Sequence, residues 1–236
     1  MLKRILFLLV VLQFTACKEL QNIAGTMLED GVLSNEQIGS GLKEALNSGI
    51  SKGVQTLSAK DGYMKSAYKI LLPAEVQKVT KKLKNIPGFN QVEDKMLTLL
   101  NRAAEDAATA AKPIFVSAIK EMTFSDAMDI LMGADNSATN YLDRTTNQQL
   151  YKAFNPKIVK SLDKVNATDY WKKAVSAYNK IPFVEKLNPS LDDYVTTQAM
   201  KGLFGMVAKK EKGIRTNISE RNTDLLRKVF AKQDNK

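Results

Sequence analysis

Residues 34–57 read SNEQIGSGLKEALNSGISKGVQTL, and this stretch shows which class of fold the chain adopts. Its apolar residues recur at spacings of four and three, the period of one helix face: Ile38, Leu42, Leu46, Ile50, Val54 and Leu57. Ser34 followed by Gln37 has the spacing of a capping box, a pattern that begins helices. The stretch therefore predicts an α-helix that buries one face.

Four glycines interrupt this helical stretch: Gly39, Gly41, Gly49 and Gly53. A glycine inside a helix costs about 1 kcal/mol relative to alanine. Two interpretations follow from their number. The glycines allow another helix to approach closely, or they break or kink the helix.

The helical period continues along most of the chain. Strand-like alternation is almost absent, and Tyr68–Leu72 is the one short stretch that could be extended. Further helices are expected at 73–86, 90–112, 114–122, 123–132, 137–144, 147–162, 169–179, 190–207 and 223–230. We predict an all-α fold: a single domain of about eight to ten helices over residues 34–232, with a short tail at 233–236.

The first residues have the three-part layout of a secretory signal peptide. Lys3 and Arg4 precede the apolar run Ile5–Leu12, and the small residues Thr15, Ala16 and Cys17 follow it. The run is well short of the roughly 18 apolar residues that span a bilayer. The sequence thus predicts a signal peptide at 1–16; a buried N-terminal helix is the alternative.

The segment Phe14-Thr15-Ala16-Cys17 resembles the lipobox of bacterial lipoproteins, although leucine is more usual at the position of Phe14. The resemblance implies that Cys17 is acylated, becomes the first mature residue and begins a lipidated tether at 17–33. Two or more acyl chains hold a protein stably on a membrane. Lys18, in place of the aspartate that retains lipoproteins in the inner membrane, implies the outer membrane, on its periplasmic face or at the cell surface.

The composition of the chain excludes several classes of site. It has 236 residues, one Cys and no His, which excludes catalytic triads with His, His-ligated zinc and internal disulfides. Removal of residues 1–16 would lower the formal charge from +10 to +8. An exported basic chain favours an anionic lipid or envelope polymer as a partner rather than nucleic acid; a solvated charged face is the alternative.

The basic residues are unevenly distributed along the chain. Residues 152–189 carry eight Lys and Arg against three Asp and Glu, and residues 201–236 carry ten against four. Aromatic residues do not alternate with these basic runs, and no glycine-rich phosphate loop accompanies them. These two regions are where we expect a basic surface.

Short motifs in order along the chain resemble the bacterial domain-of-unknown-function family 4197. They are Gly41–Leu46, Asn101–Glu105, Ile114–Phe115, Ala118–Ile119, Met122–Thr123, Asp126–Ala127, Ile130–Gly133, Ala138–Tyr141, Asp193–Thr196, Gly202–Phe204, Ile214–Arg215 and Thr223–Phe230. The resemblance covers residues 34–230 and departs from the family pattern at Lys209, Lys210 and Asn222. It implies an exported or lipoprotein-like protein and supplies no activity.

Two kinds of residues are candidates for catalysis. Ser-x-x-Lys occurs at Ser117/Lys120 and Ser161/Lys164, a spacing that chance alone produces in a lysine-rich chain. The local carboxylates are Asp126, Asp129, Asp135 and Asp143, beside Glu121. They are candidates for acid–base chemistry, but helix capping explains Asp126 more simply. The segment from Asp135 lacks the ligand series of a calcium loop, so we expect no metal and no cofactor.

Polar residues in otherwise apolar helices suggest a buried network. Asn101, Arg102 and Glu105 interrupt a helix made of Leu and Ala. We expect them to join a polar network, or to line a pocket, with further residues of this kind: Tyr141, Asp193, Arg215 and Asp224.

The sequence as a whole favours a non-enzymatic envelope lipoprotein that acts by binding or scaffolding. Two alternatives stay open. The nine methionines and the Leu/Ala-rich helices fit a helical carrier for a lipid or other apolar ligand. The clustered carboxylates fit a hydrolase that works without histidine.

Overall fold

The computed structural model describes residues 33–73, 77, 91–164, 167–180, 182–183, 185–188, 190–231 and 234 of the chain. Within these residues there are eight α-helices, a 3-10 helix at Ile218–Glu220 and no β-strand, so the predicted all-α class is confirmed. The helices are α3 (Asn35–Ser58), α5 (Val92–Ala108), α6 (Ala111–Glu121), α7 (Phe124–Met132), α8 (Ser137–Asp163), α9 (Ala167–Tyr178), α10 (Leu191–Thr216) and α11 (Asp224–Phe230). The predicted leader, most of the tether and most of the helix expected at 73–86 lie outside the described residues.

Helix α3 begins with the predicted capping box. The Gln37 N–H donates to Ser34 Oγ at 3.1 Å, and the Ser34 N–H donates to Gln37 Oε1 at 2.9 Å. The helix runs without interruption to Ser58. A Cβ added at Gly41 would lie 2.7 Å from Val229 Cγ2 of α11, and one at Gly53 would lie 3.1 Å from Met206 Cγ of α10. The close-contact interpretation of the glycines is therefore confirmed at these positions.

Helices α5 and α6 are separated by a short break at Thr109 and Ala110. Pro113 is the third residue of α6, where its missing N–H would have no helical partner in any case. The expected helix at 90–112 ends earlier than predicted because the proline ring clashes with the carbonyl four residues before it, which is that of Thr109. A run of buried small side chains lies around the break: Ala103, Ala104, Ala107, Ala108 and Ala111.

Helix α8 is one continuous helix, whereas the sequence predicted two, at 137–144 and 147–162. The reason lies in the two threonines at the expected break. Thr145 Oγ1 donates to the Tyr141 carbonyl at 2.9 Å, and Thr146 Oγ1 donates to the Leu142 carbonyl at 2.6 Å. These hydroxyls are satisfied within the helix, so it continues through residue 146 to Asp163, with Pro156 inside it.

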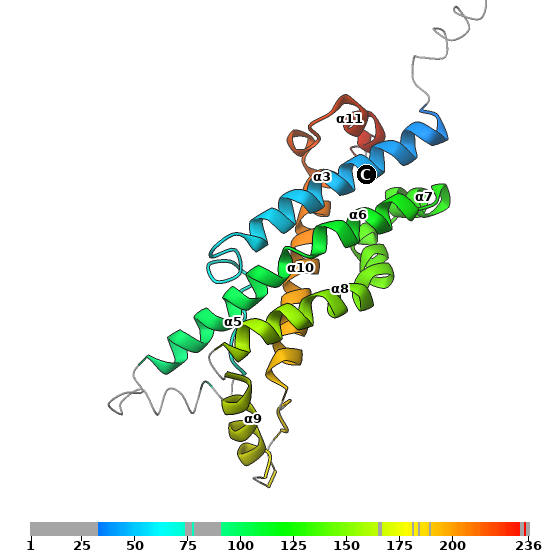
Figure 1. Ribbon diagram of the computed structural model, residues 1–236. Coiled ribbons are helices and arrows are strands. Elements are labelled where there is room, and N and C mark those ends of the chain that lie inside the picture. Colours follow the sequence, from blue (N-terminus) through cyan, green and yellow to red (C-terminus); the bar gives the residue numbers. More distant parts are fainter. Residues whose placement is uncertain are drawn as a thin grey trace, which may run out of the picture.

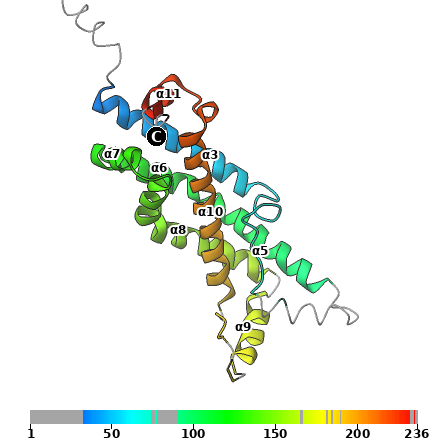
Figure 2. The same ribbon diagram turned by 180° about the vertical axis from the view of Figure 1, so that it is seen from behind.

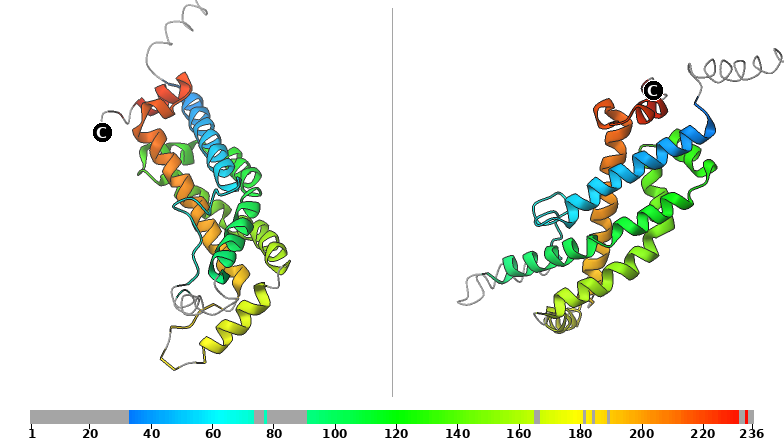
Figure 3. Two further views of the ribbon diagram at one scale, coloured as in Figure 1. Left: turned by 90° about the vertical axis from the view of Figure 1, so that its left-hand side faces the viewer. Right: turned by 45° about the horizontal axis from the view of Figure 1, so that its top comes forward.

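The helices form a layer crossed by one long helix. In Figure 1, α3, the α5–α6 pair and α8 lie side by side. Figure 2, seen from behind, shows α10 crossing in front of them, in contact with α3, α5 and α8. Figure 3 shows α9 near the beginning of α10 and α11 near its end. No helix in the described part combines the length and the apolar character needed to cross a membrane.

Candidate functional site

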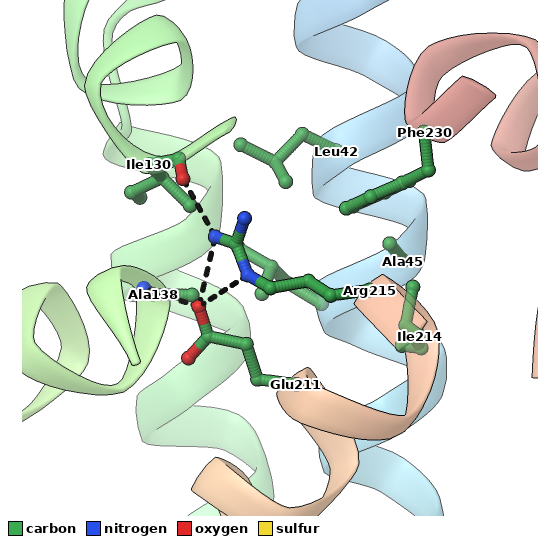
Figure 4. Close-up of a pocket in the computed structure, with 9 residues that line it drawn as sticks. Leu42, Ala45, Ile130, Ala138, Glu211, Ile214, Arg215 and Phe230 are labelled. Carbon is green, nitrogen blue, oxygen red and sulfur yellow. Dashed lines mark hydrogen bonds and ion pairs between the residues drawn. The ribbon is translucent and has the colours of Figure 1, made fainter. Parts of the chain in front are cut away.

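An ion pair is buried where α7, α8 and α10 meet (Figure 4). Glu211 and Arg215 are one turn apart on α10, and their side chains are 4% and 3% exposed. Arg215 Nη2 lies 3.0 Å from Glu211 Oε1, and its Nε donates to the same oxygen at 3.1 Å. Such a pair can persist in the core only if the remaining polar atoms also have partners.

Backbone groups of two other helices supply these partners. Glu211 accepts from the Ala138 N–H at 2.9 Å and from the Thr139 N–H and hydroxyl, each at 2.8 Å, at the start of α8. Arg215 donates to the Ile130 carbonyl at 2.6 Å, at the end of α7. The carboxylate therefore faces the positive end of α8 and the guanidinium faces the negative end of α7. We call this arrangement the capping junction.

The cavity beside the capping junction is small. Its lining includes Leu42, Ile214 and Phe230, and its volume is about 10 Å³. A cavity of this size holds about one water molecule. The capping junction is therefore a packed structural element, with no room for a lipid or a cofactor.

A second buried arginine closes the end of α10. Arg221 is 1% exposed. It donates to the carbonyls of Ile214 and Arg215 at 3.0 and 2.9 Å, and to Asp234 at 2.7 Å. The hydrogen bond from Arg221 lowers the pKa of Asp234. Arg221 thus satisfies the last carbonyls of α10, which would otherwise lack partners.

The predicted residues of α5 meet around the loop at residues 59–73, which we call the anchored loop. Asn101 Oδ1 accepts from the Ile70 N–H at 2.8 Å, and its Nδ2 donates to the Ile70 carbonyl at 2.9 Å. Glu105 accepts from the N–H groups of Tyr63 and Met64 at 3.2 and 3.3 Å. The side chains of α5 therefore hold the backbone of the loop at two points.

Arg102 links the same cluster to the surface. Its guanidinium pairs with Glu105 and with Asp61, where the backbone takes a positive φ of 71°. Hydrogen bonds from Lys65 and then Arg102 lower the pKa of Asp61. Because the Arg102 and Asp61 side chains are 34% and 26% exposed, solvent screens this pair far more than the capping junction.

The seven residues predicted to form a polar network or a pocket do not form a single cluster. Asn101, Arg102 and Glu105 hold the anchored loop, and Arg215 belongs to the capping junction. Asp193 accepts from the Tyr151 hydroxyl at 2.7 Å, between α8 and α10. Tyr141 is buried against α6, and Asp224 is an exposed first residue of α11, paired with Arg227. The structure thus places these residues at several separate positions, and Tyr141 also lines a depression between α7 and α8.

A depression of about 250 Å³ between α7 and α8 is the candidate binding surface. Its lining is mainly polar: Asp126, Asp129, Ile130, Ser137, Asn140, Tyr141 and Arg144. The Arg144 guanidinium lies over the Tyr141 ring, 5.7 Å from its centroid. Carboxylates, an amide and a guanidinium side by side can bind a small polar molecule by hydrogen bonds.

A second depression of about 330 Å³ lies between α8 and α10. It combines polar residues with two apolar side chains: Asp143, Asn147, Tyr151, Thr197, Lys201, Met200 and Phe204. The hydrogen bond to Asp193 raises the pKa of Tyr151 to about 12. Tyr151 therefore keeps its proton at neutral pH and acts as a donor.

Several of the candidate catalytic residues have structural partners. Asp126 accepts from the Thr123 hydroxyl and N–H at 2.6 and 2.9 Å, and these hydrogen bonds lower the pKa of Asp126. It therefore caps α7 as predicted and stays ionised, which does not suit a general acid. The Ser117 hydroxyl donates to Glu121 at 3.1 Å. Among the described residues, no three acids or cysteines gather as metal ligands.

The sequence interpretation missed Glu211 and Arg221 as buried polar residues. A Glu–Arg pair at i, i+4 on a helix rich in buried apolar residues is a signal that could have found the capping junction. Nothing local to Arg221 predicts its burial, because its partners depend on how the chain folds back after α10.

Comparisons with known proteins identify a family for this chain. The model of the family described as "Protein of unknown function (DUF4197)" matches residues 32–231. Comparison with curated proteins gives no match, and comparison with solved structures gives none either. Because the matched region covers most of the sequence, including every described helix, the chain belongs to the DUF4197 family.

Proposed function

We propose that this chain is a bacterial envelope lipoprotein, anchored to the outer membrane through lipidated Cys17, whose helical domain acts by binding or scaffolding. The observation that carries the proposal is the signal-peptide layout ending in Phe14-Thr15-Ala16-Cys17. The chain's one cysteine falls at the position that a lipobox requires. The mature domain would then follow Cys17 on a tether of about 16 residues.

The chemistry of the domain supports binding rather than catalysis. Its buried ionisable residues Glu105, Glu211, Arg215 and Arg221 are all hydrogen-bonded to backbone groups of other segments. Residues used in this way stabilise a rigid framework. The cavity of about 10 Å³ at the capping junction supports a surface-binding role over the carrier alternative, in which a lipid would lie inside the core.

A basic end of the domain supports an anionic partner, either an envelope polymer or a lipid surface. Exposed lysines lie on and around α9: Lys160, Lys164, Lys172, Lys180 and Lys186. Exposed acids are fewer there: Asp163, Asp169 and Glu185. In Figure 1 this end lies far from the beginning of α3, where the tether joins. Clustered lysines attract anionic surfaces within a Debye length of about 8 Å at physiological salt.

The lipid anchor is tested by Cys17→Ser in the native host. We expect loss of labelled fatty acid from the protein, accumulation of the unprocessed precursor and release from the outer-membrane fraction. Phe14→Leu is the matched control and should be lipidated at least as well as the natural chain. If Cys17→Ser is processed and membrane-bound like the natural chain, the anchor proposal is wrong.

The basic end is tested by the triple variant Lys172→Gln, Lys180→Gln and Lys186→Gln. Purified protein is mixed in separate assays with anionic vesicles and with the isolated anionic wall polymer of the host. We expect binding that weakens with salt and is lost in the triple variant. Lys43→Gln, Lys52→Gln and Lys95→Gln, which remove the same charge from other helices, form the control. Equal loss in both variants would show that only net charge matters.

A further inference from the structure

Helix α7 exposes an apolar stripe to solvent. Phe124 and Met132 are 41% and 51% exposed, values unusual for such large apolar side chains. Half-buried Met128 lies between them at the i, i+4, i+8 spacing that places all three on one helix face. We call Phe124, Met128 and Met132 the α7 stripe.

The α7 stripe lies at the end of the domain where the tether joins. A Cβ added at Gly39, in the second turn of α3, would lie 3.9 Å from Phe124 Cδ2. Helices α3 and α7 are in contact, and Figure 1 shows α7 beside the beginning of α3. The described chain starts at Leu33, just before that helix. The stripe and the point of attachment are therefore neighbours.

The α7 stripe is held rigidly, so its orientation is fixed by the fold. The capping box of Thr123 and Asp126 closes the beginning of α7. Arg215 binds the Ile130 carbonyl near its end, and the buried Ala127, Ile130 and Leu131 hold the adjoining face against the core. A helix fixed at both ends and along one face presents the neighbouring face as a preformed surface.

We propose that the α7 stripe rests on the lipid surface into which Cys17 is anchored, and so orients the domain. This proposal depends on the lipid anchor proposed above. The 17 residues from Cys17 to Leu33 reach at most about 55 Å when fully extended. A tether of that length keeps the domain near the bilayer but leaves its orientation open. Apolar side chains beside the attachment point would supply that orientation, with Phe124 and Met132 entering the interfacial region.

The charges around the stripe indicate which lipids it would contact. Asp129 is three residues before Met132, which makes it a surface neighbour of the stripe, and Lys120 at the end of α6 is the nearest exposed lysine in sequence. A carboxylate beside the stripe gains nothing from anionic headgroups. The contact is therefore apolar, and it should not depend on salt or on the fraction of anionic lipid. In this orientation the basic end around α9 points away from the anchoring membrane.

The experiment uses the full lipidated protein in vesicles of phosphatidylethanolamine and phosphatidylcholine. Phe124→Cys and Met132→Cys are labelled separately with an environment-sensitive NBD dye, since acylated Cys17 does not react. Lys172→Cys, exposed near the far end, is the matched control. We expect emission at shorter wavelength and quenching by spin-labelled lipid at 124 and 132, and neither effect at 172.

Each other outcome overturns the proposal in a different way. Vesicle-bound protein whose dye at 124 and 132 stays solvent-exposed would show that the anchor exists and the stripe does not touch lipid. A wavelength shift that requires high protein density would assign the stripe to a second copy of the chain. A shift that disappears in high salt would show an electrostatic contact instead. Protein that does not bind the vesicles at all would contradict the anchor, and with it the stripe.

Discussion

The capping junction and the anchored loop are both held by polar side chains, but they differ in how far those side chains are exposed to solvent. In both, side chains from one helix satisfy backbone groups of other segments. At the capping junction Glu211 and Arg215 are almost fully buried and bind the ends of two helices. At the anchored loop Asn101 and Glu105 are buried, but Arg102 and Asp61 reach the solvent. If one partner at the capping junction is lost, the other is therefore shielded from bulk water.

This difference predicts a graded response to mutation. A charge left alone in a low-dielectric environment is costly, whereas water can solvate a partner exposed at the surface. The neutral hydrogen bonds of Asn101 lie between these limits. The four predictions below run from the largest expected loss of stability to the smallest.

The largest loss is expected for Arg215→Met. It leaves the Glu211 carboxylate buried without its cation and removes the donor to the end of α7, which should destabilise the fold by about 3–5 kcal/mol. Urea unfolding followed by circular dichroism measures the change. Lys212→Met, an exposed neighbour on α10, is the control and should be nearly neutral. Adding Glu211→Gln to Arg215→Met should recover part of the loss; if it does not, the buried charge is not the cause.

A somewhat smaller loss is expected for Asn101→Ala. It leaves the Ile70 N–H and carbonyl without their side-chain partner, and we expect a loss of about 3 kcal/mol. Hydrogen exchange should speed up first at Ile70 and its neighbours in the loop. Thr98→Ala, one turn earlier on the exposed side of α5, is the control. Equal exchange of the loop in both variants would contradict the role given to Asn101.

A moderate loss is expected for Gly202→Ala, which tests how the anchored loop packs on α10. The new methyl would lie 2.8 Å from Tyr63 Cε1, so the ring must shift, at a cost of about 1–3 kcal/mol. Tyr63 is also held by its hydroxyl, which donates to the Ala199 carbonyl at 2.7 Å. Gly39→Ala, where the methyl has ordinary contact distance, should instead stabilise by up to about 1 kcal/mol. Thermal unfolding measures both effects: the midpoint should fall for Gly202→Ala and rise for Gly39→Ala. A midpoint that does not fall for Gly202→Ala would contradict the tight packing of Tyr63 on α10.

The smallest effect is expected for Asp61→Asn and depends on pH. The pKa of Asp61 is lowered in the folded state, so its ionised form stabilises the fold above the unfolded pKa of 3.8. That contribution disappears as the pH falls through the folded pKa. The variant should therefore be slightly less stable than the natural chain at pH 7 and equal to it in strong acid. Unfolding curves from pH 7 to 2 measure this; a difference that grows toward low pH would contradict the assignment.

Much of the fold could be predicted because its signals are local. The capping boxes at Ser34 and Thr123, and the apolar stripe of α3, each depend on residues within a few turns of one another. The break expected near residue 146 was wrong because threonine hydroxyls bonded within their own helix. Polar positions such as Asn101 and Arg215 could be identified as buried. Their partners could not, because Ile70 and Ile130 are 31 and 85 residues away in sequence.

The position of Glu211 and Arg215 along the chain has a consequence for the order of folding. Helices α7 and α8 are synthesised well before α10, yet the groups that complete their facing ends lie 72 to 85 residues downstream. Contacts at such long sequence separation form late and slow the folding rate. The facing ends of α7 and α8 therefore lack these hydrogen-bond partners until α10 has been synthesised. In the export proposed above, the domain would acquire these contacts only after α10 has followed the earlier helices across the membrane.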